Sequence, residues 1–108
     1  MPVEITPREL AQRLENGHAI RLVDVRQPWE NELAKLPDSL LIPLNELPTR
    51  AAEVPVNAEA LVVVYCHHGV RSLSGAAYLR RLGHVNVTSL AGGIDAWSCE
   101  VDPAVPRY

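Results

Sequence analysis

The chain contains 108 residues, of which 47% are hydrophobic, and its formal net charge is −3 at pH 7. This length suits one hydrophobic core, so we expect a single domain over residues 1–108, and the negative charge argues against a nucleic-acid or anionic-membrane partner. Because no stretch approaches the roughly 20 apolar residues of a membrane span, and the first residues lack the basic and apolar regions of a signal peptide, we predict a cytoplasmic protein with no membrane partner.

A short strand and a capped helix are predicted at the start of the chain. Residues 3–5 alternate between apolar and polar side chains, which is typical of an edge strand. Thr6 and Glu9 have the spacing of a capping box, in which each side chain accepts a hydrogen bond from the backbone of the other residue. We expect the helix that follows to turn Leu10 and Leu14 into the core.

The second predicted strand, residues 20–25, brings charged residues to its carboxyl end. Asp24 and Arg26 either border a ligand site at this edge, or pair with each other or with Glu30 and only fix the loop. Both interpretations remain open from the sequence. A short helix opened by a proline is predicted over residues 27–32.

The remaining chain continues this alternation of strands and helices. We predict a strand over 40–42, a helix over 44–53 that is broken or kinked at Pro48, a connection over 55–57, a strand over 85–90 and a short helix after Gly92 and Gly93. The two glycines would let the backbone of their turn approach a neighbouring loop closely. From Cys99 onward the chain has no periodic pattern and is predicted to be coil. The alternation is typical of an α/β domain with a mainly parallel sheet.

Cys66 stands where a buried strand meets a helix. Residues 61–65 are a β-branched run of the kind found in strands buried on both faces, and residues 73–82 have the apolar spacing of a helix. Cys66 therefore lies at the carboxyl end of a strand. In open α/β sheets ligands bind at this edge, where the N–H groups of helix N-termini favour anions.

The residues around Cys66 favour a reactive thiol. The thiolate is the nucleophilic form of cysteine, and the loop N–H groups, the helix dipole and the Arg71 guanidinium all have the sign that favours it. Gly69 permits a positive φ in so short a turn. The alternative is that Cys66 is an inert, buried small residue, as most intracellular cysteines are.

The histidines beside Cys66 are metal-ligand types, but adjacent side chains in a tight loop do not converge easily on one tetrahedral ion, and we expect no metal. His67 and His68 lie either at the mouth of the site, where their protonated forms would attract an anion, or simply on an exposed loop. Cys99 is either a resolving thiol or a spare one. Trp29 and Trp97 are interpreted as packing residues rather than substrate platforms, and His84 as a surface turn residue.

The sequence resembles the rhodanese-like sulfurtransferases in their small single-domain form. The resemblance runs through residues 22–26, 29–30, 42–44, 66–72 and 92–97. It implies an α/β fold with a central, mainly parallel five-stranded sheet flanked by helices. It also implies an enzyme of the thiosulfate sulfurtransferase type, without a cofactor, whose catalytic cysteine takes a sulfane sulfur from a donor and passes it to a nucleophilic acceptor.

Carried to this chain, the resemblance implies that Cys66 is the sulfur carrier. The substrate-binding cradle around its persulfide would be formed by the backbone of His67, His68, Gly69, Val70, Arg71 and Ser72. The Arg71 side chain would face an anionic donor such as thiosulfate. The acceptor would be cyanide or a thiol, with a thioredoxin-like or other persulfide-carrying protein as a further partner.

Other activities are weighed against this one. Four residues separate Cys66 from Arg71, whereas the related cell-cycle phosphatases and arsenate reductases use a loop one residue longer, so sulfur is favoured over a tetrahedral oxyanion. The two loop histidines do not match the small residues of mercaptopyruvate-using members. A sulfur-relay or protein-binding module without turnover is the alternative from another class. Asp38 stands where many members have glycine, and we expect it to adopt the same left-handed turn.

Overall fold

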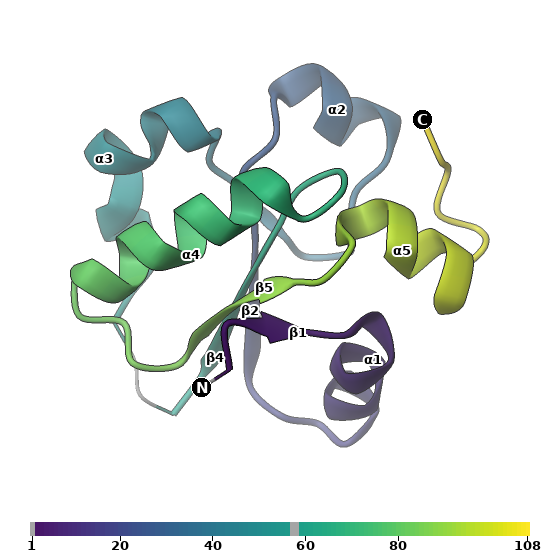
Figure 1. The fold of residues 1–108 in the computed structure, drawn as a ribbon, viewed down its shortest axis with the longest axis horizontal. Coiled ribbons are helices and arrows are strands. Elements are labelled where there is room, and N and C mark those ends of the chain that lie inside the picture. The colour runs from purple at the N-terminus through teal and green to yellow at the C-terminus, as the bar shows by residue number, and fades with distance from the viewer. Residues whose placement is uncertain (1, 57–58) are drawn as a thin grey trace.

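The computed structural model describes residues 2–56 and 59–108, so Asn57, the last residue of the predicted 55–57 connection, lies outside the described residues. The sheet has the strand order β1-β5-β4-β2-β3, and its pairings are parallel (Figure 1). The strands are β1 (Glu4–Ile5), β2 (Ile20–Asp24), β3 (Leu40–Leu41), β4 (Leu61–Tyr65) and β5 (Val87–Leu90). The predicted five-stranded, mainly parallel sheet is confirmed, with β1 at an edge.

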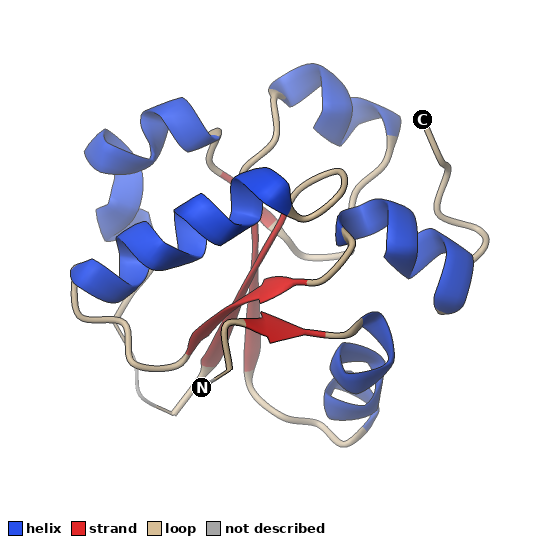
Figure 2. Cartoon of the chain, viewed as in Figure 1, coloured by secondary structure: helices blue, strands red, loops and turns tan. Residues whose placement is uncertain are grey.

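Helices flank this sheet on both faces (Figure 2). They are α1 (Pro7–Glu15), α2 (Pro28–Leu33), α3 (Leu47–Arg50), α4 (Val70–Arg81) and α5 (Gly93–Glu100). Short 3-10 turns at 44–46 and 51–53 adjoin α3, so the helix predicted over 44–53 is broken, and Pro48 lies in the first turn of α3. In the part of the chain that the structure describes, no helix is long and apolar enough to cross a membrane.

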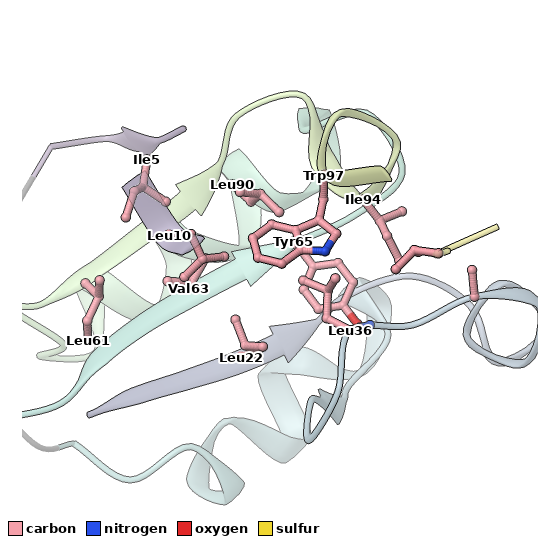
Figure 3. Packing of buried hydrophobic residues seen from close by; sticks show 12 residues of the cluster. Ile5, Leu10, Leu22, Leu36, Leu61, Val63, Tyr65, Leu90, Ile94 and Trp97 are labelled. Carbon is pink, nitrogen blue, oxygen red and sulfur yellow. The ribbon is translucent and has the colours of Figure 1, made fainter. Parts of the chain in front are cut away.

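Strand β4 separates two hydrophobic clusters, one on each face of the sheet. Its residues are all buried, and alternate side chains point to opposite faces. The cluster in Figure 3 lies under α1 and α5 and includes Leu10, Val63, Tyr65, Ile94 and Trp97. The other cluster lies under α4 and includes Val62, Val64, Cys66, Ala76 and Leu79. Cys66 therefore continues the face of β4 that α4 covers.

The local signals at the start of the chain are confirmed with one exception. Thr6 Oγ1 accepts from the Glu9 N–H at 3.1 Å, and Glu9 Oε1 accepts from the Thr6 N–H at 3.2 Å, so the capping box is formed. Leu10 is buried, but Leu14 is 42% exposed, so the inward prediction for Leu14 is wrong. Leu14 belongs to the last turn of a helix that ends at Glu15, and Leu10 rather than Leu14 is a member of the hydrophobic cluster on this face of the sheet.

The prediction that His84 is a surface residue is wrong. Only 4% of its surface is exposed, and in the segment between α4 and β5 it lies beside residues 51–56, which follow α3. There His84 lines a cavity of about 290 Å³, together with apolar residues that include Val54 and Leu82. Burial disfavours the charged imidazole and lowers the pKa of His84 below its usual value of 6.5.

His84→Leu is expected to reduce the loss of unfolding free energy that occurs as the pH falls below neutral. Because the pKa of His84 is lowered in the folded state, the unfolded state takes up the proton first, so stability is full above about pH 6.5 and falls as the pH drops below it. Urea unfolding at pH 7.5 and pH 5.5 measures the loss, which should be smaller in the variant than in the wild type. His18→Leu, in an exposed loop, is the control. Equal losses in wild type and His84→Leu would contradict this account.

Candidate active site

The Cys66 sulfur occupies the position of a helix cap. Cys66 directly follows β4 and is 1% exposed. Its Sγ accepts hydrogen bonds from the N–H of Gly69 at 3.1 Å and of Ser72 at 3.4 Å. Gly69 is the N-cap of α4 and has no side chain to accept from the first turn, so the sulfur takes that role. Within the predicted cradle, these two amides reach the sulfur.

Two glycine-dependent backbone features hold this loop. Gly69 has φ +95°, as the prediction of a positive φ in the turn requires, and it lets the chain enter α4 at Val70, three residues before the predicted start. The turn at Gly93 packs directly against the loop, since a Cβ added there would collide with the carbonyl oxygens of Cys66 and His67. The predicted close approach of the glycine turn to a neighbouring loop is therefore confirmed.

Arg71 is paired with a buried carboxylate. Its Nη1 and Nη2 donate to the two oxygens of Glu30 at 2.7 and 2.9 Å, and the Glu30 side chain is 5% exposed. These hydrogen bonds lower the pKa of Glu30 to about 2. The pKa of Arg71 is raised, chiefly by the same hydrogen bonds and to a smaller degree by the charges of Glu30 and Cys66. Arg71 thus lies near the sulfur as one half of a neutral pair, with its side chain 36% exposed.

Tyr108 completes this network and was missed by the sequence analysis. Its hydroxyl donates to Glu30 Oε1 at 2.9 Å and accepts from Arg26 Nη1 at 2.8 Å. Its ring stacks on His67 with centroids 3.9 Å apart, and the C-terminal segment runs beside α2 and α5 in Figure 1. Burial raises the pKa of Tyr108 to about 12. The segment after α5 has no periodic pattern, so no sequence signal marked this contact.

Asp24 and Arg26 do not lie on the rim of the site, and that interpretation is wrong. Arg26 Nε and Nη2 donate to the two Asp24 oxygens, each at 2.8 Å, and both side chains are 0% exposed. Burial opposes the charge of Arg26, but the hydrogen bonds to Asp24 and Tyr108 outweigh it and raise the pKa. The alternative in which the two residues pair with each other is confirmed, and both side chains are closed off from solvent.

The two histidines lie in different surroundings. His67 is half-buried between Tyr108 and His68, and burial together with the charge of His68 lowers its pKa. The His68 side chain is 63% exposed, with Nδ1 4.0 Å from Asp95. Cys99 is exposed on α5. Across residues 2–56 and 59–108, no three His, Cys, Asp or Glu side chains are grouped closely enough to hold a metal ion.

The tryptophan predictions are half right. Trp97 is 7% exposed and belongs to the cluster under α5, as expected. Trp29 is 59% exposed, so the prediction that it is a packing residue is wrong. The short helix α2 turns Glu30 inward, which leaves the neighbouring Trp29 outside. There its ring and that of Tyr108 form a T-shaped pair with centroids 6.2 Å apart.

Glu30→Gln is expected to lower the free energy of unfolding at pH 7 by about 2 kcal/mol, because charge-assisted hydrogen bonds to the carboxylate are lost. The folded state holds the pKa of Glu30 near 2, so its stabilisation is complete above about pH 4.5 and is lost as the pH falls toward 2. Urea unfolding should therefore show a smaller difference at pH 3 than at pH 7. Glu32→Gln removes an exposed carboxylate from the same helix, and an equal effect there would contradict the prediction.

Comparison with known proteins agrees with this architecture. The family model of the rhodanese-like domain matches residues 6–100. A curated sulfurtransferase from Allochromatium vinosum is 40% identical over 95 residues, which cover 88% of this chain and 87% of that protein. The probable adenylyltransferase/sulfurtransferase MoeZ of Mycobacterium tuberculosis is 33% identical over 104 residues, which cover 96% of this chain but 26% of MoeZ. The human single-domain sulfurtransferase TSTD1 superposes with a TM-score of 0.81 at 27% identity, over 93% of this chain and 98% of that one.

The molecule is an α/β protein whose parallel sheet places a cysteine at the N-terminus of a helix, and its relatives include sulfurtransferases. The chain belongs to the rhodanese-like domain family. The resemblance identified in the sequence is confirmed, and membership of this family supports the prediction that the chain is a transferase.

Proposed function

We propose that this chain transfers a sulfane sulfur from thiosulfate or a persulfide donor to cyanide or a thiol, through a persulfide on Cys66. The observation that supports this most directly is that the buried sulfur accepts hydrogen bonds from the N–H groups of Gly69 and Ser72 at the start of α4. A negatively charged sulfur is a stronger hydrogen-bond acceptor than a thiol, so this position favours the nucleophilic form.

The proposed reaction has two displacements at sulfur. The Cys66 thiolate attacks the outer sulfur of thiosulfate, the bond between the two sulfurs of thiosulfate breaks, and its electron pair leaves with sulfite. The acceptor then attacks the outer sulfur of the persulfide, and the electron pair of that bond returns to Cys66. The loop from His67 to Ser72 binds the transferred sulfur, and its fixed N–H groups stabilise charge without a general base.

A protein partner is a second candidate for donor or acceptor. Glu30 neutralises Arg71, which weakens the attraction of the site for a small anion. Two apolar side chains around the loop are also exposed, Trp29 at 59% and Val70 at 75%, and such side chains suit contact with a protein. MoeZ and related adenylyltransferase/sulfurtransferases carry a matching segment within a longer chain, which is consistent with sulfur relay between proteins.

Thiocyanate formation from thiosulfate and cyanide tests the proposal. We expect the wild type and Cys99→Ser to turn over, and Cys66→Ser to be inactive. If thiosulfate is a poor donor while a protein persulfide loads Cys66 rapidly, the relay form of the function holds. Activity that survives in Cys66→Ser, or failure of every persulfide and thiosulfate donor to load Cys66, would refute sulfur transfer by this residue.

A further inference from the structure

A pair of buried hydroxyl groups extends from the Cys66 sulfur into the sheet. Ser72, in the first turn of α4, places its Oγ 3.4 Å from Cys66 Sγ. Ser89, in β5, places its Oγ 2.7 Å from Ser72 Oγ. Both serines are 0% exposed. Because alternate residues of a strand share a face, Ser89 lies on the same side of β5 as Val87, which packs in the cluster under α4.

The protons of these groups can be counted. Each serine hydroxyl carries one proton and can also accept hydrogen bonds, whereas a thiolate can only accept. While Cys66 is a thiol, its S–H donates to Ser72 Oγ, as the structure has it. Once Cys66 is a thiolate, the Ser72 hydroxyl must turn and donate to the sulfur. The Ser89 hydroxyl can then donate to Ser72 Oγ, so the Ser72 hydroxyl donates and accepts at the same time.

We propose that Ser89 is a positioning residue for the Cys66 thiolate: its hydroxyl stabilises the orientation in which Ser72 donates to the anionic sulfur. Hydrogen bonds in a chain polarise and strengthen one another in a buried site, so the Ser89 hydroxyl strengthens the hydrogen bond that Ser72 donates to the sulfur. Ser89 touches neither the sulfur nor a substrate and acts only through Ser72. The inference rests on the proposed function for what the thiolate does, but not for its formation.

The ultraviolet absorbance of the thiolate, recorded against pH, tests this role. The measurement uses a Cys99→Ser background, in which Cys66 is the remaining cysteine of the chain. We expect Ser89→Ala to raise the pH midpoint of thiolate formation by about half a unit or more, the effect of one net hydrogen bond. Thr88→Val deletes a hydroxyl from the neighbouring position of β5, equally buried but with no hydrogen-bond partner among residues 2–56 and 59–108, and should leave the midpoint unchanged.

A double variant separates a positioning role from a structural one. If Ser89 acts through Ser72, then Ser89→Ala adds no further shift once Ser72→Ala is present. The other titratable and charged groups around the loop are unchanged between the variants; they are His67, His68, Arg71, Glu30, Asp95 and Tyr108. Urea unfolding of each variant confirms that it is folded before titration.

The proposal is overturned by a midpoint in Ser89→Ala equal to that of the wild type, or by an equal shift with and without Ser72. If Ser89→Ala does not fold, Ser72→Ala alone must raise the midpoint, and an unchanged midpoint there also overturns it. The titration contains no sulfur donor. Its result is therefore independent of whether the chain transfers sulfur, which loading with thiosulfate or a persulfide decides separately.

Discussion

Gly93→Ala is expected to lower the free energy of unfolding by about 3 kcal/mol or more, because the cost of a side chain at a positive φ and the cost of a collision between its Cβ and the neighbouring loop add together. Gly93 has φ +65°, a conformation that side chains other than glycine rarely adopt. The added Cβ would meet the carbonyl oxygens of Cys66 and His67, which are backbone atoms of the sulfur loop. The loop must move to relieve the contact, so loading of sulfur on Cys66 should fall with stability.

Gly17→Ala is the matched control for this substitution. Gly17 has a similar φ of +72°, but no atom of the residues that the structure describes lies within 4 Å of the Cβ that would be added. Its variant should therefore show only the smaller cost of the left-handed conformation, about 1 to 2 kcal/mol. Urea unfolding of both variants at pH 7 measures the difference. Equal destabilisation at the two positions would show that close packing of the Gly93 turn on the loop contributes nothing.

Asp24→Asn is expected to cost about 3 to 5 kcal/mol of unfolding free energy, because it leaves the Arg26 charge buried without its counter-charge. The amide keeps the shape of the carboxylate, so the loss reports charge rather than volume. Arg26 also donates to Tyr108 and to the Ala34 carbonyl oxygen, and these contacts hold the guanidinium in place when its partner is neutral. The charge therefore cannot escape to solvent without local unfolding.

An exposed pair on the same molecule provides the comparison. Glu53 accepts from Arg50 at 2.7 Å, but both side chains are substantially exposed. Water solvates these charges when the pair is broken, so Glu53→Gln should change the midpoint of urea unfolding far less than Asp24→Asn. If the two substitutions had similar effects, the buried pair would have no special role in stability.

Features with short-range signals could be predicted from the sequence. The Thr6 capping box needs only two residues three apart, and the tight turn after β4 follows from a β-branched run, a cysteine and Gly69. Asp38 has φ +59°, so the left-handed turn expected there is confirmed. In each case the backbone conformation is decided by neighbouring residues.

Features that depend on distant residues could not be predicted in this way. Glu30 contacts Arg71, 41 residues away, and Tyr108, 78 residues away, and no sequence pattern at these residues indicates that they pair. The same reason accounts for the errors in burial: His84 and Trp29 are of types found both inside and outside proteins, and only the packing of other segments decides which. The neutral pair at Arg71 is thus a tertiary feature of the site.

Intact-mass spectrometry of the reduced protein tests the central claim most directly. The protein is measured before and after thiosulfate, or a protein persulfide, and again after cyanide, with Cys66→Ser and Cys99→Ser in parallel. A persulfide on Cys66 predicts a gain of one sulfur atom in the wild type and in Cys99→Ser, removed by cyanide, and no gain in Cys66→Ser. A gain that persists in Cys66→Ser, or no gain from any donor while Cys66 remains open to alkylation, would contradict it.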